Sequence, residues 1–234
     1  MKKVNLIIGI VLFVGLLFFI CFQNKSYIVF ENELKTADID DTPNKKQIDF
    51  VEKNKSKKDE GTYNIIGSIK INGTNINNTL VQGDDNEYYL NHSENNIKNL
   101  EGSIFVDYRN TFEDRKILIY GHNSRTLKTA LFHDLEKYLK ESFYKKNKYI
   151  ELVLRNEKTK WEIFSVMIVS HNDNRHMKIT FNDREYIEHL SWLKKASIYD
   201  TKVNVDVNDK IITLQTCYYK PANSFLIINA KKIK

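Results

Sequence analysis

The hydrophobic and polar positions of this chain fall into three successive patterns. The first is an unbroken apolar run over residues 4–22, VNLIIGIVLFVGLLFFICF, with one Asn, no charge, and Lys2 and Lys3 before it. About 20 such residues span the hydrocarbon core of a bilayer as a helix. A secretory signal has a shorter apolar region and ends at a small-x-small cleavage site, which FFICFQNKSY does not offer. We therefore expect an uncleaved transmembrane anchor.

The second pattern is a polar stretch over residues 23–62, whose apolar positions are too few for a core. It is predicted as a partly helical stalk. The two N-terminal lysines place residues 1–3 in the cytoplasm by the positive-inside rule. The expected location is therefore the cell membrane, crossed once, with the remainder of the chain outside the cell.

The third pattern fills residues 63–234, where short β-branched and aromatic runs alternate with Asn, Gly and Asp turns. The runs are IIGSIKI, NTLVQG, GSIFVDY, KILIYGHN, YIELVLR, WEIFSVMIVS, KITF, IITLQTCYY and SFLIINA. Many short strands with polar turns predict a mainly β domain, either a closed or nearly closed barrel or a sandwich.

Helical spacing interrupts the strands at three places, which predicts a few peripheral helices. Residues 85–91 suit a short turn, and residues 127–140 carry Leu127, Leu131, Leu135 and Leu139 at helical spacing. A third helix is expected after a cap at Asn182 or Asp183. Its apolar face is predicted to hold Tyr186, Ile187, Leu190 and Leu193.

Composition narrows the function classes. The chain has 36 Lys and Arg against 30 Asp and Glu, a net charge of +6, and residues 1–22 hold two of the lysines and no acid, which leaves +4 beyond them. Charges of both signs are interspersed, without an arginine-rich block or a nucleic-acid fingerprint, so no nucleic-acid partner is expected. The balance suits an anionic surface such as a bacterial envelope.

The cysteines bring chemistry into the picture. Cys21 lies inside the apolar run, so Cys217 is the single cysteine of the expected exterior domain. Three interpretations of its thiol are open: a buried, unreactive thiol, a disulfide with another chain, or a catalytic thiol. The strand-like run that ends in Cys217 has a counterpart that ends in Gly121-His122-Asn123. An adjacent imidazole turns a thiol into a nucleophile, so these two strand ends form a candidate Cys–His site.

The residues around both strand ends resemble the class B sortases. The resemblance covers about residues 66–230 and rests on GSIFVDYRN at 102–110, IYGHN at 119–123 and TLQTC at 213–217, together with GSIKINGTNINNTLVQGDDNEYYLNHS. It implies an eight-stranded sortase-type β-barrel and an extracellular cysteine transpeptidase that needs no cofactor and no metal.

The resemblance also implies roles and partners. Cys217 would attack the threonine carbonyl of an N-P-x-T-like signal at the C-terminus of a secreted protein, and His122 would protonate the departing amine. A thioacyl enzyme would form, and an amine of a wall peptide or peptidoglycan precursor would release it. Leu214, Thr216 and Asn123 are the expected substrate-cleft residues.

The chain departs from the family at one place. Sortases carry an arginine on the strand after the cysteine, but YYKPANSFLIINAKKIK contains none. Aligning the closing R-x-V-V-x-A pattern on Ala230 puts Phe225 there, with Ser224 beside it, and Lys220 is the candidate substitute cation. Two alternatives therefore stay open: a sortase-fold protein with impaired turnover that binds signals, and a hydrolytic cysteine peptidase.

The remaining charged and imidazole groups are expected to be structural. Arg109 belongs to the DYRN turn and is predicted to stabilise it. A zinc site built from Cys217 and two loop histidines lacks ligand spacing. Surface or capping positions are expected for the histidines without a motif, which are His92, His133, His171, His176 and His189.

Overall fold

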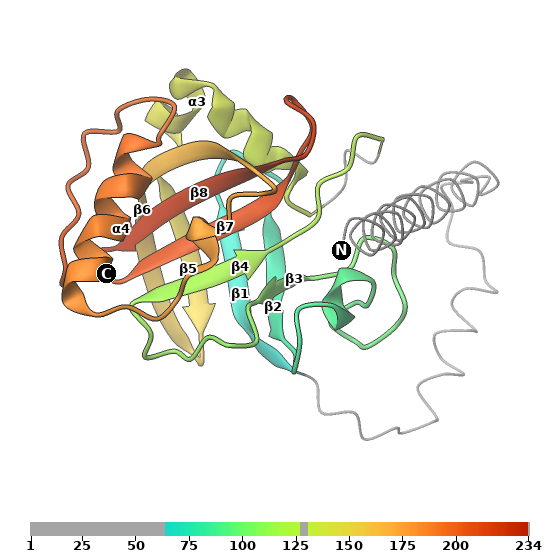
Figure 1. The fold of residues 1–234 in the computed structure, drawn as a ribbon. Helices are drawn as coiled ribbons and strands as arrows, with labels where there is room; N and C mark the ends of the chain where they lie inside the picture. The colour runs from blue at the N-terminus through green and yellow to red at the C-terminus, as the bar shows by residue number, and fades with distance from the viewer. Residues whose placement is uncertain (1–63, 127–130, 234) are drawn as a thin grey trace, which may run out of the picture. The chain divides into compact units, whose positions relative to one another are not determined.

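The structure is a computed structural model that describes residues 64–126 and 131–233. The expected cytoplasmic tail, anchor and stalk at 1–3, 4–22 and 23–62 lie outside these residues. Within the described residues, no helix combines the length and the apolar character that crossing a bilayer requires. Figure 1 shows the described chain as one curved sheet with helices around it.

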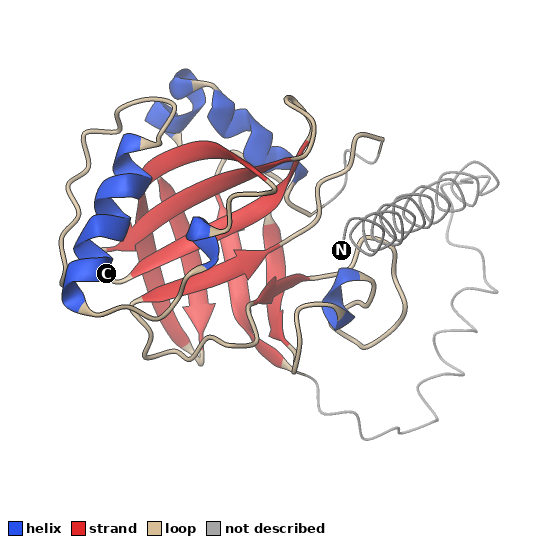
Figure 2. Cartoon of the chain, in the orientation of Figure 1, coloured by secondary structure: helices blue, strands red, loops and turns tan. Residues whose placement is uncertain are grey.

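Eight strands form a closed barrel in the order β1-β2-β3-β4-β7-β8-β6-β5. All neighbours are antiparallel except β2–β3 and β4–β7, which are parallel. The mainly β, eight-stranded fold expected from the resemblance is therefore confirmed (Figure 2). The strands are β1 (Ile65–Ile71), β2 (Asn77–Gln82), β3 (Ile104–Val106), β4 (Lys116–Tyr120), β5 (Tyr149–Leu154), β6 (Glu157–Ser170), β7 (Ile211–Tyr218) and β8 (Ser224–Lys232).

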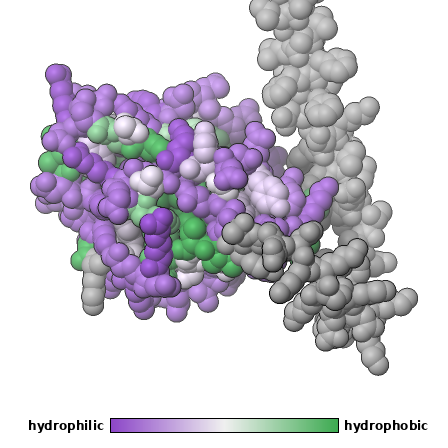
Figure 3. Space-filling model, turned by 90° about the horizontal axis from the view of Figure 1, so that it is seen from below, coloured by the Kyte–Doolittle hydropathy of each residue, from purple (hydrophilic) through white to green (hydrophobic). Residues whose placement is uncertain are grey.

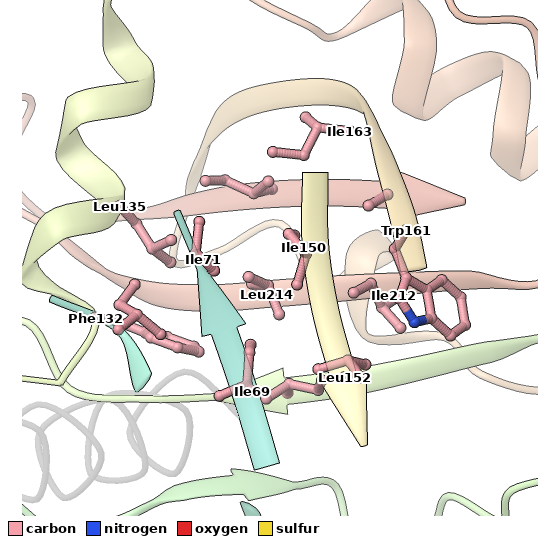
Figure 4. Packing of buried hydrophobic residues seen from close by; sticks show 14 of the residues in the cluster. Ile69, Ile71, Phe132, Leu135, Ile150, Leu152, Trp161, Ile163, Ile212 and Leu214 are labelled. Carbon is pink, nitrogen blue, oxygen red and sulfur yellow. The ribbon is translucent and has the colours of Figure 1, made fainter. Parts of the chain in front are cut away.

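The barrel interior holds the main hydrophobic core. Alternate residues of each strand point inward, because successive side chains of a strand face opposite sides of the sheet. Figure 4 shows these side chains converging from several strands, among them Ile69, Ile150, Ile212 and Leu214. All four are fully buried. This packing fixes which residues of β4 and β7 point outward, toward the site described below.

Helix α4 (Asp183–Lys195) covers part of the outer face of the barrel. Asn182 caps it: its side-chain oxygen accepts a hydrogen bond from the Glu185 N–H, and the Glu185 carboxylate accepts one from the Asn182 N–H. Tyr186, Leu190 and Leu193 are buried as predicted. Ile187 is instead 52% exposed, because it lies about 100° around the helix from Tyr186, and His189 occupies the buried face in its place.

Two other predicted elements differ from the structure. The residues described from the 127–140 segment form a 3₁₀ helix, η2 (His133–Leu139), followed by the α-helix α3 (Glu141–Lys146). The KITF run at 178–181 is a loop, although Ile179 packs on an outer cluster with Val81 and Tyr120. A closed barrel has no free edge at which a ninth strand could pair. Two further 3₁₀ turns are η1 (Tyr88–Leu90) and η3 (Arg175–Met177).

The described surface is mostly hydrophilic on the face shown in Figure 3, with hydrophobic side chains gathered in a limited area. Several exposed hydrophobic residues come from the β2–β3 connection, namely Tyr88, Leu90, Ile97 and Leu100. This connection borders the site, because the Leu90 carbonyl is bonded to His122.

Candidate active site

The parallel strands β4 and β7 end at the same rim of the barrel. Their register pairs Tyr120 with Gln215. Beyond it, the Gly121 N–H donates to the Gln215 carbonyl at 3.3 Å, and the Thr216 hydroxyl donates to the Gly121 carbonyl at 2.7 Å. Continued by two residues, this register sets His122 beside Cys217. The structure thus places at the same rim the two strand ends that carry the residues that the sequence singled out.

Both side chains belong to the outer face of the sheet. On β7, Ile212 and Leu214 lie in the interior core, whereas Ile211 lies in the outer cluster with α4, so the odd-numbered positions point outward. On β4, Ile117 and Ile119 point inward. Since side chains alternate, Cys217 and the continuation of β4 at His122 share the outer face. The two strand ends that carry the thiol and the imidazole therefore lie at one rim of the barrel.

The Cys217 thiol is partly exposed and forms no disulfide. Burial raises the pKa of this thiol above its usual value of 9.0. At neutral pH the free protein therefore holds a thiol rather than a thiolate at this position. A thiol reacts as a nucleophile in its thiolate form, so a nucleophilic role for Cys217 would require a neighbouring base.

His122 is held by hydrogen bonds on both its ring and its backbone. Its Nε2 lies 2.7 Å from the Leu90 carbonyl oxygen, which can only accept, so Nε2 carries a hydrogen and Nδ1 is left to exchange a proton. The His122 carbonyl accepts from the Phe132 N–H at 2.8 Å. Gly121 makes this approach feasible, because a Cβ there would lie 2.7 Å from the Phe132 ring.

Asn123 joins the two strand ends. Its Nδ2 donates to the Cys217 carbonyl at 3.0 Å and to Glu136 Oε1 at 2.6 Å, while its Oδ1 lies 2.8 Å from His133 Nδ1. The Asn123 carbonyl also accepts from the Tyr219 hydroxyl at 2.9 Å. The sequence predicted that Asn123 lines the substrate cleft. Asn123 is only 4% exposed, so it instead positions the backbone of the site.

The other two expected cleft residues also point away from the outer face. Leu214 is fully buried in the barrel core, and Thr216 is 2% exposed with its hydroxyl committed to the Gly121 carbonyl. Both residues have even numbers on β7. Because side chains alternate along a strand, the even-numbered side chains of β7 point into the barrel. In this structure neither residue can contact a substrate on the outer face.

The β7–β8 ladder shows which of the two residues expected at the arginine position faces Cys217. Phe225 stands directly opposite Cys217, whereas Ser224 stands opposite Tyr218 and is 3% exposed. Tyr218 belongs to the interior core, so Ser224 faces inward and Phe225 outward. Lys220 is exposed in the turn between the two strands. The side chain that faces the nucleophile across the ladder is therefore an apolar ring.

Two histidines that the sequence placed at the surface or in caps contact this ring. The ring centroids of His171 and Phe225 are 4.1 Å apart, and those of His176 and Phe225 are 5.7 Å apart. His176 is fully buried, and its Nε2 lies 2.8 Å from Gln215 Oε1, two residues before the nucleophile. Burial lowers the pKa of His176 to about 4, so its ring is neutral at physiological pH.

A buried lysine holds the segment that carries these histidines. Lys116, the first residue of β4, is fully buried, and its Nζ donates to the His176 carbonyl and lies 2.9 Å from His189 Nε2. Burial and then the Arg109 charge hold the pKa of Lys116 well below its usual value. Burial, followed by the Lys116 charge, lowers the pKa of His189 to about 3. Residues 171–182 are therefore fixed against β4.

The DYRN turn fixes the same segment from its other side. The buried Asp107 carboxylate accepts hydrogen bonds from Arg109, from the Tyr120 hydroxyl at 2.7 Å and from Asn86. Burial alone would raise the pKa of Asp107, but these bonds outweigh it and lower the pKa to about 2. Arg109 also donates to the Met177 carbonyl at 3.2 Å. The structural role predicted for Arg109 is confirmed.

Comparison with known proteins assigns this arrangement to a family. Residues 69–233 match the sortase domain family. Sortase B of Staphylococcus aureus is 36% identical over 175 residues, which cover 73% of this chain and 70% of that protein.

Solved structures agree with the sequence comparison. The crystal structure of Clostridium perfringens sortase B superposes with a TM-score of 0.70 at 35% identity, covering 74% of this chain and 96% of that one. A Staphylococcus aureus sortase B–substrate complex gives a TM-score of 0.68 at 35% identity, covering 74% and 81%.

Proposed function

The chain belongs to the sortase family and, within it, to the class B sortases, which are cysteine transpeptidases; on this premise we propose that it attaches secreted proteins to the cell wall. The substrate is a C-terminal signal of the N-P-x-T type, cleaved after threonine. The acceptor is an amine of a wall peptide or peptidoglycan precursor. One solved relative at 35% identity is described as a sortase B–substrate complex, which supports a peptide substrate here.

The reaction proceeds by two acyl transfers. His122 takes the Cys217 proton, and the sulfur forms a bond to the threonine carbonyl carbon. His122 then gives the proton to the leaving nitrogen as the C–N bond breaks, which leaves a thioacyl enzyme. The acceptor amine attacks the thioester carbonyl and loses a proton to His122, and the Cys217 sulfur leaves as the carbon–sulfur bond breaks and takes that proton from His122, which restores the thiol. Atoms and charge balance without any co-reactant.

The single observation that carries this proposal is the shared rim of β4 and β7. The two parallel strands that precede His122 and Cys217 end at one rim, and the Asn123 amide donates to the Cys217 carbonyl, which supports the pairing of this imidazole with this thiol. The raised pKa of Cys217 favours proton removal by His122 during attack over a stable ion pair in the resting protein.

Replacing Cys217 by Ala tests the nucleophile. The variant should fold like the wild type, because the change from thiol to methyl is small, and it should form no thioacyl adduct. Mass spectrometry of the protein after incubation with a threonine-containing signal peptide measures the adduct. Cleavage at an unchanged rate by Cys217→Ala would disprove the assignment.

Replacing His122 by Ala tests the proton transfer. General acid–base groups contribute roughly 10²-fold or more, so turnover should fall by at least about that factor. The expected loss applies to release of the leaving amine, measured with a fluorescence-quenched peptide. A variant that keeps most of the wild-type rate would exclude His122 from the mechanism.

The apolar Phe225 opposite Cys217 favours one alternative function, a slow enzyme that retains signals as a binding module. Acceptor amines discriminate the candidates. A transpeptidase yields a peptide–amine conjugate, a hydrolase yields the free acid at the same rate with or without amine, and a binding module yields a persistent complex with little product.

We further propose that residues 4–22 anchor the protein in the membrane, with residues 1–3 in the cytoplasm and the barrel outside the cell. The uncharged apolar run and its preceding lysines support this location.

A further inference from the structure

Acyl transfer at Cys217 builds a negative charge that the thiol and the imidazole do not stabilise. When the sulfur attacks a carbonyl, an electron pair moves onto the carbonyl oxygen, and fixed donors that meet this charge are usually the largest catalytic contribution. Phe225, which stands directly opposite Cys217, has no donor. Under the proposed acyl transfer, on which this inference rests, another side chain has to stabilise the oxyanion.

Most donor-bearing side chains around Cys217 and Phe225 already use their hydrogens. Both hydrogens of the Asn123 amide are committed, one to the Cys217 carbonyl and one to Glu136. The others donate to backbone carbonyls, namely the Thr216 and Tyr219 hydroxyls and the Nε2–H groups of His122 and His171. An oxyanion could recruit any of these hydrogens only by breaking a bond that holds the site together.

Gln215 has a donor that is not committed in this way. It precedes Cys217 by two residues on β7, so both side chains lie on the outward face. Its Oε1 lies 2.8 Å from His176 Nε2, but its Nε2 has no hydrogen-bond partner among the described residues. In that part of the chain, the one fully buried side-chain polar atom without a partner is His176 Nδ1. The Gln215 amide nitrogen is therefore open to solvent.

The buried His176 ring fixes which end of the Gln215 amide is left uncommitted. The low pKa of His176 keeps its ring neutral, with a single hydrogen. Because Oε1 can only accept, that hydrogen is on Nε2. The reverse orientation of the amide would put the hydrogen on Nδ1, and buried N–H groups without a partner are rare. His176 thus holds the oxygen of the amide and leaves its NH₂ group available.

The same contact directs the amide toward the β8 side of Cys217. Outward residues that follow one another on a strand are about 6.5 Å apart, a spacing that a glutamine side chain largely bridges. The His176 ring lies 5.7 Å from the Phe225 ring, centroid to centroid, and Phe225 is the β8 partner of Cys217. Gln215 and His176 therefore border the same part of the outer face as the thiol.

We propose that Gln215 is a catalytic residue whose amide N–H donates to the oxyanion formed at Cys217, and that His176 positions this amide. The hydrogen bond strengthens as the sulfur–carbon bond forms and an electron pair moves onto the oxygen. It weakens when that pair returns to carbon and the C–N bond breaks. Gln215 neither gains nor loses a proton in the cycle.

Two cations of the described residues are competing candidates. The Arg125 guanidinium lies 4.6 Å from the centroid of the Tyr219 ring, beyond the end of β7. Lys220 is exposed in the β7–β8 turn and provides a point charge on a flexible stem. The Gln215 amide is instead held by a buried partner before any substrate arrives, and such preorganisation is what makes an oxyanion donor effective.

The test replaces the amide in two ways. Gln215→Met removes it at similar length, and Gln215→Glu keeps an oxygen for His176 but removes the donor. Asn172→Asp, the same change from amide to acid at an exposed position, is the matched control. Each full-length variant is assayed for acylation by a signal peptide and by p-nitrophenyl acetate, and for alkylation by iodoacetamide. Acylation builds charge on a carbonyl oxygen, whereas alkylation builds none.

Losing one oxyanion donor typically costs about 10²–10³ in rate, so kcat for acylation should fall about 10²-fold in both Gln215 variants, with little change in KM. Alkylation of Gln215→Met should proceed at the wild-type rate, and Asn172→Asp should match the wild type in every assay. If Gln215→Met does not fold, Gln215→Glu decides, because it keeps the contact with His176. Unchanged acylation would overturn the inference, and so would an equal loss of acylation and alkylation, which indicates a structural role.

His176→Phe tests the positioning role. Because this change removes the hydrogen bond to Gln215, acylation should fall while alkylation stays unchanged. His176→Gln, whose amide can donate in place of Nε2–H, should recover part of the rate. Adding Gln215→Met to His176→Phe should cost little more, since both changes disable the same donor. Losses that combine in full, or a His176→Gln protein that folds but recovers nothing, would contradict this role.

The proposed function and this inference fail separately. A wild-type protein that reacts with p-nitrophenyl acetate but with no signal peptide contradicts the proposed substrate and leaves the Gln215 comparison intact. A loss of acylation of about 10²-fold in Arg125→Gln or Lys220→Met, with both Gln215 variants unaffected, would assign the donor to that cation instead.

Discussion

Phe225 and Ser224 are adjacent on β8 but face opposite sides of the sheet. Phe225 borders the outer face beside Cys217, while Ser224 points into the barrel opposite Tyr218. A substitution that introduces charge should therefore have opposite consequences at the two positions. The same alternation explains why Leu214 and Thr216 lie in the TLQTC motif without reaching the site.

Phe225→Arg should raise the rate of peptide acylation, because it adds a planar cation on the face where the oxyanion forms. Ser224→Arg should instead unfold or strongly destabilise the barrel, since it forces a charge into the core. Acylation kinetics and thermal unfolding of both variants measure these effects. A Phe225→Arg protein that folds normally and reacts no faster than the wild type would contradict this prediction.

At this scale, the sequence could predict that Cys217 and His122 lie at strand ends, because each sits in a short motif at the end of an apolar run. It could not predict the surroundings of Phe225. His171 reaches it from β6, and His176 is placed by a bond to Gln215, 39 residues further along the chain. The burial of Lys116 could not be predicted from the sequence either, because its partners come from the 171–182 segment and α4.

Among the structural elements, the DYRN turn depends most on a single buried charge. Asp107 → Asn should destabilise the protein by about 2 kcal/mol, the size typical of hydrogen bonds to a charged group. Urea unfolding at neutral pH measures this loss, and Asp84→Asn, an exposed acid on the β2–β3 connection, is the matched control.

The pH dependence of stability should identify the same carboxylate. Its pKa falls from 3.8 to about 2 on folding, so its stabilising contribution is complete above about pH 4 and is lost as the pH falls toward 2. Asp107→Asn should lose less stability over that interval than the wild type. Parallel acid profiles for the two proteins would place the acid-sensitive group elsewhere.

Elements with strong local patterns were predicted best. The strand runs and the Asn182 cap of α4 need only alternation and a capping box, and both appear in the structure. The KITF run fails as a strand, because strand formation also requires a free partner and the closed barrel leaves none. The predicted apolar face of α4 included Ile187, but His189 occupies the buried face in its place. A polar residue was not expected there, and His189 is buried because it contacts Lys116.

For the whole molecule, removal of residues 1–22 should give a soluble protein that retains acylation activity, since every described element of the barrel begins after residue 63. Fractionation of cells should place the full chain with the membranes and the shortened chain in the soluble fraction. An inactive or insoluble shortened chain would show that the barrel needs this segment.

Orientation is tested separately in intact cells. Protease added to the medium should degrade the barrel of the full chain while a cytoplasmic marker protein remains whole. Protection of the barrel under these conditions would contradict the proposed orientation.

The closed order of the eight strands could be predicted only through the resemblance to class B sortases, because alternating hydrophobic and polar residues alone fit a sandwich equally well.

The place of β7 between β4 and β8 has a consequence for a newly made chain. Synthesis delivers the chain from its N-terminus, so His122 is made long before Cys217, whose carbonyl is bonded to a residue 94 positions earlier. In the proposed mechanism His122 deprotonates Cys217, and the strand that carries Cys217 pairs with β4 only after residue 218 has been made. An unfinished chain therefore has no acyl-transfer activity under this proposal, and it gains that activity only when β7 takes its place in the barrel.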